Sequence, residues 1–296
     1  MKLVRYGAVN EERPGIVDDS GSIRSLYPLV DDFSVDMLAE EWMDILRSID
    51  IEKLPIVPGE PRLGAPVKGL RQVIAIGLNY LDHAKEGGIA APEYPLVFAK
   101  SVGSVSGSDD PIILPSWAKH VDWEIELAFF IGKAVFEVPV EKALDYVAGY
   151  CTAMDISERR LQIGPGGQTG HGKSLDSFTP LGPWFVTADE IHDPQKLNLW
   201  LEVNGKRFQD GNTSDMLFSV ATIISHLSRY QTLLPGDLVL TGTPAGIGHT
   251  TGYQIVNDLS ELGLGVTPPT YLRPGDGVVG GVEGLGVQRH CIVARG

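Results

Sequence analysis

A short acidic stretch near the middle of the chain constrains the fold more than any other feature. Acidic and apolar residues alternate in DWEIEL, residues 122–127, and successive side chains of a strand point to opposite faces. Asp122, Glu124 and Glu126 would therefore share one face, with the two glutamates about 7 Å apart, twice the rise of ~3.3 Å per residue. The apolar run that follows, residues 127–131, predicts that this strand enters the core.

Carboxylates at the edge of a core need compensation. Burying them without a partner costs free energy, and hard divalent cations prefer carboxylate oxygens as ligands. The spacing therefore favours a metal site. An exposed acidic face on an edge strand would give the same pattern, because runs of charge are usually solvated, and the spacing alone leaves both interpretations open.

Composition excludes several classes of partner. The chain has 296 residues, 43% of them hydrophobic, which is enough for a large core. Its 24 Lys and Arg against 38 Asp and Glu give a formal charge of -14, which argues against nucleic acid and against an anionic membrane surface as partners. No run approaches 18 apolar residues, the N-terminus has no signal-peptide pattern, and two cysteines are too few for a disulfide framework. We therefore expect a cytoplasmic protein without a membrane span.

Prolines and glycines between residues 55 and 66 predict a linker. Before it we expect strands at residues 3–9 and 23–26 and a helix from Ser34 to about Ile49. The predicted boundary near residue 69 divides the chain into a small N-terminal α+β domain, residues 1–68, and a larger domain, residues 69–296. The first part shows no convergent polar cluster, so we predict a packing or assembly module.

The larger part has the pattern of a mainly β protein. Short strands are predicted at residues 72–77, 96–99 and 150–154, and a hairpin at residues 200–208 turns at Asn204-Gly205. Helices are predicted only at residues 140–147 and 216–230. Few helices, 35 Gly and 20 Pro favour a mainly antiparallel β (α+β) fold over a doubly wound α/β sheet.

A glycine-rich loop at residues 167–174, GQTGHGKS, matches the phosphate-binding loop pattern. That mechanism needs a buried strand before the loop and a helix after it. The preceding residues, 157–162, are polar, and Pro180 and Pro183 oppose a following helix. We therefore reject nucleotide binding and predict that the loop carries Lys173 inward.

Five motifs together resemble the fumarylacetoacetate hydrolase family, over about residues 69–296. In chain order they are Gly77-Leu78-Asn79-Tyr80 with His83 and Glu86, the acidic stretch 122–127, Asp155-Ile156-Ser157-Glu158-Arg159 with Gln162, the Gly172-Lys173-Ser174 loop, and Thr241-Gly242-Thr243-Pro244. The likeness is greatest to the bacterial branch of 2,4-diketo-3-deoxy-L-rhamnonate hydrolases and acylpyruvases. It implies a β-roll catalytic domain, a homodimer or higher homo-oligomer, and one Mg²⁺ or Mn²⁺ per site.

The resemblance also implies a reaction. Members of this branch hydrolyse the C3–C4 bond of a 2,4-diketo acid to pyruvate and a carboxylic acid. A divalent cation held by Glu124, Glu126 and Asp155 would stabilise the pyruvate enolate as a Lewis acid.

The same resemblance suggests roles for other residues. His83, oriented by Glu86, would be the general base for the attacking water, and Lys173 would stabilise developing negative charge. The substrate-binding candidates are Arg159, Gln162, Thr243, Lys100 and Tyr80. From the residues alone, a histidine on a solvated turn, a surface lysine and ordinary loop polarity would explain the same pattern.

Two alternatives and one departure stay open. The same site would suit an oxaloacetate-type decarboxylase or a keto–enol tautomerase, and a non-catalytic metal-binding or sugar-acid-binding protein is a third possibility. Residues 249–266 form an insert compared with the branch that the chain resembles. An insert of this length predicts an interface or a lid, and it leaves the acyl half of the substrate undefined.

Overall fold

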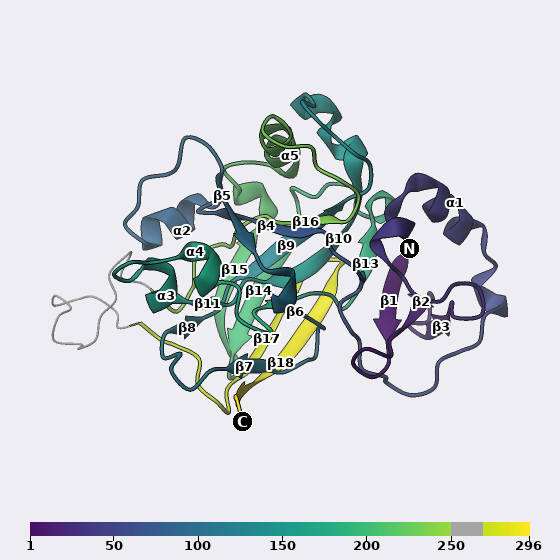
Figure 1. Cartoon of the computed structure of the whole chain (residues 1–296), viewed down its shortest axis with the longest axis horizontal. Coiled ribbons are helices and arrows are strands. Elements are labelled where there is room, and N and C mark those ends of the chain that lie inside the picture. The colour runs from purple at the N-terminus through teal and green to yellow at the C-terminus, as the bar shows by residue number, and fades with distance from the viewer. Residues whose placement is uncertain (250–268) are drawn as a thin grey trace.

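The computed structural model describes residues 1–249 and 269–296, so the insert predicted to form an interface or a lid lies almost wholly outside the described residues. A long sheet runs through the whole molecule (Figure 1). Among the described residues it has nine strands, in the spatial order β3 (Ile23–Ser25), β2 (Arg13–Val17), β1 (Lys2–Tyr6), β13 (Phe185–Thr187), β10 (Val147–Met154), β9 (Ile125–Ile131), β16 (Asp237–Leu240), β4 (Gln72–Gly77) and β5 (Leu96–Lys100).

A second sheet packs against the middle of the first. Its described strands are, in spatial order, β15 (Lys206–Asn212), β14 (Asn198–Val203), β17 (Gly277–Val282), β18 (Gly286–Ala294) and β7 (Ile112–Leu114). Two strand pairs complete the described β structure, β8 (Val121–Asp122) with β11 (Ser157–Glu158) and β6 (Val105–Ser106) with β12 (Thr179–Pro180). Most pairings are antiparallel, which confirms the predicted mainly β (α+β) fold.

Helices are short and lie around the sheets (Figure 1). The α-helices are α1 (Glu40–Ser48), α2 (Leu81–Glu86), α3 (Arg159–Ile163), α4 (Thr169–Gly172) and α5 (Val220–Ser228). Single 3₁₀ turns occur at Val35–Leu38, Ile51–Lys53, Val102–Ser104, Ala188–Glu190 and Thr213–Asp215, with a longer one at Val140–Tyr146. None of the helices in the described parts of the chain has the length and apolar character needed to cross a bilayer.

Strand β9 is buried on both faces and separates two hydrophobic clusters. Ile125, Leu127, Phe129 and Ile131 face the second sheet, and Ala128 and Phe130 face the other side. This alternation is the period of two that the sequence predicts. It places Glu126 on the side opposite its apolar neighbours, at the end of the strand where the core opens.

Two predicted elements are wrong in detail. The helix expected from Ser34 to Ile49 is divided, because Ala39 adopts an extended conformation between a 3₁₀ turn and α1. The strand expected over residues 122–127 is interrupted at Trp123 and Glu124. The carboxylate of Asp122 accepts the backbone N–H of Trp123 at 2.8 Å, and such a local bond competes with a strand ladder.

The first 68 residues share both a sheet and a core with the rest of the chain. β1 pairs with β2 and also with β13, where Lys2 faces Val186. The ring of Phe185 lies 5.4 Å from that of Phe33 and 5.2 Å from that of Phe130, measured between centroids. The predicted division at residue 69 therefore crosses a continuous hydrophobic cluster.

The N-terminal part also contains a polar cluster that the sequence analysis did not expect. Arg5 bonds Asp32 at 2.6 Å, and Arg62 bonds Glu12 at 2.9 Å and Asp110 at 2.6 Å. Arg5 also approaches Glu12 at 3.4 Å, and Lys68 bonds Asp32 at 3.0 Å. We call these six residues the N-terminal charge cluster. It was missed because its members are spread over about a hundred residues of sequence.

Candidate active site

Strand register brings the three predicted metal ligands together. On β9 and β10, Ile125 faces Met154, so the next residues, Glu124 and Asp155, lie opposite each other, and the N–H of Asp155 donates to the carbonyl of Glu124 at 2.9 Å. One carboxylate oxygen from each of Glu124, Glu126 and Asp155 lies within 4.8 Å of the other two. All three side chains are buried, so the alternative interpretation, an exposed acidic face on an edge strand, is wrong.

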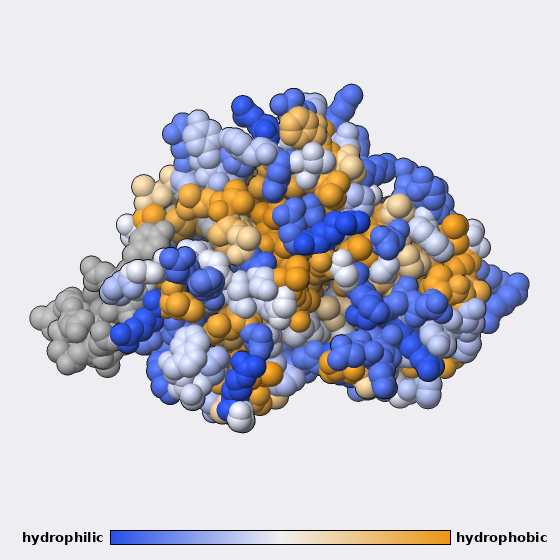
Figure 2. All heavy atoms as spheres, in the orientation of Figure 1, coloured by the Kyte–Doolittle hydropathy of each residue, from blue (hydrophilic) through white to orange (hydrophobic). Residues whose placement is uncertain are grey.

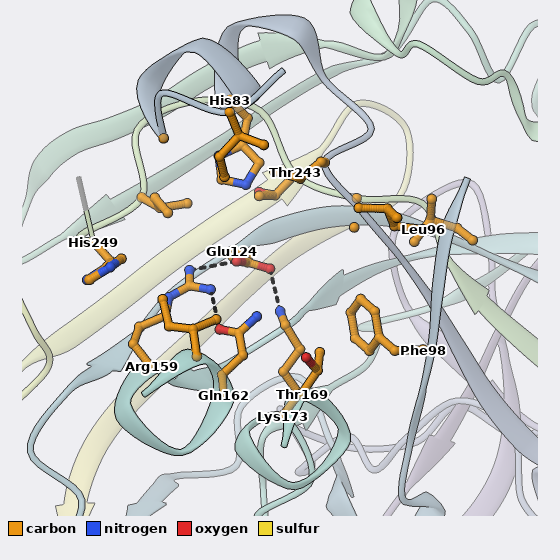
Figure 3. A pocket seen from close by; sticks show the side chains of 18 of the residues that line it. His83, Leu96, Phe98, Glu124, Arg159, Gln162, Thr169, Lys173, Thr243 and His249 are labelled. Carbon is orange, nitrogen blue, oxygen red and sulfur yellow. Dashed lines mark hydrogen bonds and ion pairs between the residues drawn. The ribbon is translucent and has the colours of Figure 1, made fainter. Parts of the chain in front are cut away.

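Two buried lysines offset part of the negative charge of these three carboxylates. The Lys173 ammonium donates to Glu124 at 2.8 Å (Figure 3). It also donates to Asp155 at 2.5 Å. Lys100 donates to the other oxygen of Asp155 and, at 3.0 Å, to the carbonyl of Phe178. Lys173 directly follows α4, where a side chain at Gly172 would meet the backbone nitrogen of Gln162 at 2.7 Å. The glycine-rich loop thus permits close packing of α4 on α3 and carries Lys173 inward, as predicted.

Arg159, the first residue of α3, links the acidic group to its surroundings. Its Nε donates to Asp122 at 2.8 Å, its Nη2 to Glu124 at 2.6 Å and its Nη1 to the Gln162 carbonyl oxygen at 2.9 Å. The amide nitrogen of Gln162 then points into the pocket toward Glu124 (Figure 3). Asp122 also accepts the N–H groups of Gly248 and His249, at 2.7 and 3.0 Å.

The charges at the site do not balance. Asp122, Glu124, Glu126 and Asp155 carry four formal negative charges, and Lys100, Lys173 and Arg159 carry three positive ones, all on buried side chains. We call these seven residues the site charge cluster. Glu126 has the weakest compensation, because its hydrogen bond in the described structure comes from the backbone N–H of Gly242, at 2.6 Å.

The pKa values of the buried residues at the site shift according to the charges around them. Burial raises the pKa of Glu126 well above its ordinary value, and the negative charges of Asp155 and Glu124 raise it further. Burial acts in the same direction on Glu124, but the cations of Lys173 and Arg159 outweigh it and lower the pKa of that carboxyl. For Lys173 burial is opposed by Asp155 and Glu124, which raise the pKa of the ammonium.

These residues fit a divalent cation. The donor set is three carboxylates from two adjacent strands, which suits a hard ion such as Mg²⁺ or Mn²⁺. The carboxylates converge, and the cluster has one more formal negative charge than it has buried cations. A bound cation would offset that excess. Glu124, Glu126 and Asp155 would hold it.

A cavity of about 400 Å³ opens above the acidic group. Its wall includes Glu124, Glu126, Arg159, Gln162, Lys173, Thr243 and His83. His83 lies on α2 at the upper side of the pocket (Figure 3). Its Nδ1 is 3.6 Å from Glu86, a distance too long for a hydrogen bond. This nitrogen has no hydrogen-bond partner among the described residues. Glu86 instead accepts the N–H of Gly246 with both oxygens, at 3.1 Å.

Thr243 lines the pocket from the loop that follows β16. Its hydroxyl donates to the carbonyl of Ile125 at 2.8 Å and accepts from the amide of Gln209 at 2.8 Å. The hydroxyl proton is therefore already used within the protein. A contact from Thr243 to a substrate carboxylate would involve its backbone N–H.

Lys100 and Tyr80 do not line the cavity. Lys100 lies behind Asp155 and is placed to hold that carboxylate. Tyr80 is fully buried, and its hydroxyl has no hydrogen-bond partner within residues 1–249 and 269–296. Burial raises the pKa of this phenol well above its ordinary value. The structure thus brings His83, Arg159, Gln162, Thr243 and Lys173 to the pocket wall and keeps these two candidates away from it.

Sequence reasoning missed Gln209, on β15. Its carbonyl oxygen accepts the N–H of Ile125 at 2.9 Å, and its amide group donates to Thr243 and to the carbonyl of Pro244, both at 2.8 Å. It thus fixes the residue between the two glutamates relative to the Thr243 loop. The only local signal was a polar residue on an alternating strand.

The chain is similar to several known proteins. The sequence model named fumarylacetoacetate (FAA) hydrolase C-terminal matches residues 72–293. A curated protein of Burkholderia lata, provisionally named a hydrolase, is 48% identical over 297 residues, which cover 100% of both chains.

Solved structures of enzymes are also similar, each covering 100% of both chains. Fumarylacetoacetate hydrolase from Exiguobacterium antarcticum has a TM-score of 0.83 at 35% identity. A 5-carboxymethyl-2-hydroxymuconate delta-isomerase from Mycobacterium smegmatis has 0.74 at 32% identity. Maleylpyruvate hydrolase from Sphingobium sp. SYK-6, solved with manganese(II) and pyruvate, has 0.79 at 27% identity. The chain therefore belongs to the fumarylacetoacetate hydrolase family, whose structural relatives include both hydrolases and isomerases.

Proposed function

We propose that this protein is a divalent-metal-dependent hydrolase that cleaves the C3–C4 bond of a 2,4-diketo acid to give pyruvate and a carboxylic acid. One observation carries the proposal: a buried three-carboxylate group with an excess negative charge forms the floor of a small pocket, and His83 lies on the opposite wall. The maleylpyruvate hydrolase relative, solved with manganese(II) and pyruvate, supports the same substrate half.

The metal ligands would be Glu124, Glu126 and Asp155. When bound, Mg²⁺ or Mn²⁺ supplies Lewis-acid stabilisation of negative charge on the oxygens of a 2-oxo acid. Lys100 holds one oxygen of Asp155 and Lys173 holds the other. This leaves the carboxylates little freedom to reorient, and a preorganised ligand set loses less free energy on binding.

The polar groups of the pocket wall have separate tasks. The free amide hydrogens of Gln162 and the backbone N–H of Thr243 donate to substrate oxygens. Arg159 orients Gln162 through its own hydrogen bond to the Gln162 carbonyl oxygen. Lys173, on the pocket wall, adds positive charge where the negative charge of the cleaved carbon skeleton develops.

His83 would act on water. It accepts a proton as the water oxygen bonds to C4, and the C3–C4 bond then breaks, leaving its electron pair on the pyruvate half, which takes up a proton at C3. Glu86 lies close enough to orient the imidazole after a small movement, since catalytic hydrogen bonds are often long in unliganded structures.

The test uses protein stripped of metal with a chelator and then supplied with Mg²⁺ or Mn²⁺. Acetylpyruvate should release pyruvate only with metal, and in ¹⁸O-labelled water one heavy oxygen should appear in the acetate. His83→Ala should lower turnover by about 10²–10⁴-fold, and Glu86→Gln should lower it less. Unchanged turnover in His83→Ala would remove the general-base role.

A second candidate follows from similarity to the delta-isomerase. Decarboxylation of oxaloacetate or keto–enol tautomerisation on the same site would need no water attack at C4. In that case oxaloacetate would be the better substrate, His83→Ala would retain most activity, and no ¹⁸O would enter a carboxylate group of the products. We also propose a homodimeric assembly from the family resemblance, which light scattering of the purified protein would test.

A further inference from the structure

The pocket has a second wall that the proposed chemistry does not use. The apolar residues of the lining come from five separate segments, Ile76 with Leu78, Ile89, the β5 residues Leu96, Val97 and Phe98, Ile163, and Ile247, and those of β5 belong to this wall. Figure 3 shows Leu96 and Phe98 together on the side of the pocket opposite Arg159 and His249. Figure 2 shows hydrophobic residues gathered in the middle of this face of the molecule, in the region where Figure 1 places β4 and β5.

The cations of the pocket already have carboxylate partners. Of the described residues that line it, Lys173 and Arg159 are the full cations. Lys173 is paired with Glu124 and Asp155, and Arg159 with Asp122 and Glu124. A second carboxylate on the substrate, placed against Leu96 and Phe98, would approach Lys173, whose Nζ lies 5.2 Å from the centroid of the Phe98 ring. Because that ammonium is already paired with two carboxylates, the substrate carboxylate would find no unpaired cation among these residues. An ion buried without a partner carries a large free-energy cost.

Hydroxyl groups would meet a similar difficulty there. The uncharged hydrogen-bonding side chains on the described lining are Gln162, Thr169, Thr243 and the two histidines. In Figure 3 Thr169 is drawn between Lys173 and Phe98, whereas the others lie around the acidic group and the upper side of the pocket. Each buried hydroxyl left without a partner costs about 1–3 kcal/mol. A polyhydroxylated chain is therefore a poor match for the β5 side.

We propose that the half of the substrate that becomes the carboxylic acid is an uncharged alkyl or aryl group that packs against Leu96, Phe98 and their apolar neighbours. This inference rests on the proposed hydrolase function and selects acylpyruvates over 2,4-diketo-3-deoxy sugar acids within it. The cavity of about 400 Å³ lies toward the small end of the range of small-molecule pockets, so the acyl group is of modest size.

The experiment compares kcat/KM for three series on the metal-loaded protein. Acetyl-, butanoyl- and hexanoylpyruvate test apolar contact. An analogue of hexanoylpyruvate with a carboxylate at the end of its acyl chain, the ω-carboxylate, tests charge. A 2,4-diketo-3-deoxy sugar acid tests hydroxyl groups. Burial of a methylene contributes about 0.8 kcal/mol, so kcat/KM should rise about fourfold for each one until the wall is filled. The ω-carboxylate should be at least about 10²-fold poorer than hexanoylpyruvate, the equivalent of about 2.7 kcal/mol.

Leu96→Ser provides the matched variant, because Leu96 is 44% exposed on an edge strand and its replacement leaves the core intact. It should reduce the gain per methylene along the alkyl series. Val102→Ser, at a similarly exposed apolar residue outside this pocket (47%), should leave the whole series unchanged.

The outcomes separate the two proposals. If the charged or hydroxylated acid releases pyruvate as well as the alkyl series does, the proposal of an apolar acyl half is overturned. The proposed hydrolase function would then remain intact. A flat alkyl series would lead to the same conclusion. No pyruvate from any of these acids would overturn the proposed function and this inference together.

Discussion

The two charge clusters of this molecule have the same number of cations but different surroundings and different balance. In the N-terminal charge cluster Arg5, Arg62 and Lys68 face three acids, so the formal charges cancel. Arg5 is buried, but Arg62 and Lys68 keep contact with solvent. In the site charge cluster three cations face four acids, and the side chains are buried. Balanced pairing suits a structural ion-pair network, whereas an excess of buried acid is costly until a further cation binds.

The pKa shifts show the same contrast. In the N-terminal charge cluster burial would raise the pKa of Asp32 and Asp110, but the side-chain bonds to Arg5 and Arg62 outweigh it, and both pKa values fall below the ordinary 3.8. In the site charge cluster Glu126 shifts the opposite way. The two clusters can therefore be told apart by experiments that add or remove one charge.

The largest effect is expected from Glu126→Gln, which removes the excess negative charge without changing the size of the side chain. Turnover should fall by about 10³-fold or more, since losing a metal ligand forfeits several kcal/mol of charge stabilisation. Without metal, the melting temperature should stay level or rise, because a buried acid has been neutralised. Calorimetry with and without Mg²⁺ checks this; a Mg²⁺-dependent rise in melting temperature as large as in the unmodified protein would contradict it.

Lys173→Met should make the imbalance at the site worse. Turnover should drop by about 10²–10³-fold, as for loss of one charge-stabilising donor. The metal-free variant should melt lower, and millimolar Mg²⁺ should restore much of the loss, because a cation substitutes for the missing ammonium charge. Loss of substrate binding with unchanged kcat would instead make Lys173 a positioning group.

Arg62→Met breaks the balanced cluster and leaves Glu12 and Asp110 with less compensation. The free energy of unfolding should fall by about 1–3 kcal/mol, less than for a fully buried pair because these side chains are partly solvated. Activity per folded molecule should not change, and Mg²⁺ should not rescue stability beyond its effect on the unmodified protein. Chemical denaturation gives the first quantity, and recovery of stability in Arg62→Met with Asp110→Leu would tie the loss to the unpaired acid.

The smallest effect concerns acid sensitivity. Because the folded-state pKa values of Asp32 and Asp110 are lowered, their stabilisation is present above the unfolded value near 3.8 and is lost as pH falls through the folded values. Asp110→Asn should therefore flatten the decline of stability below about pH 4. Denaturation curves at pH 5, 4 and 3 measure this, and an unchanged slope would show that other acids dominate the decline.

The strands and the identity of the ligand residues were predictable because they follow local rules. The alternation in residues 122–127 predicts that Glu126 lies opposite Ile125 and Leu127, and Asn204-Gly205 predicts the hairpin turn, where both residues have positive φ. The five motifs, read in order, indicated the family to which the chain belongs. The branch and the roles of single residues are predictions that wait for the experiments above.

What the sequence could not show depends on distance along the chain. Gln209 meets Ile125 across 84 residues, and Arg62 meets Asp110 across 48, and no local periodicity reports such contacts. The interruption of the strand at Trp123 has the same origin, because Asp122 serves the N–H groups of Gly248 and His249 as well as its own neighbour. Charge balance likewise becomes visible only when the partners are known.

The sheet shared by the two halves also has a consequence for protein engineering. Exchanging residues 1–68 between family members, as if they were an independent cassette, would have to preserve the pairing of β1 with β13 and the ring contacts of Phe33 with Phe185. Chimeras joined near residue 69 should therefore fold only when both parents present compatible edges there. Recombination libraries for new specificities are better confined to β5 and the segments that face it.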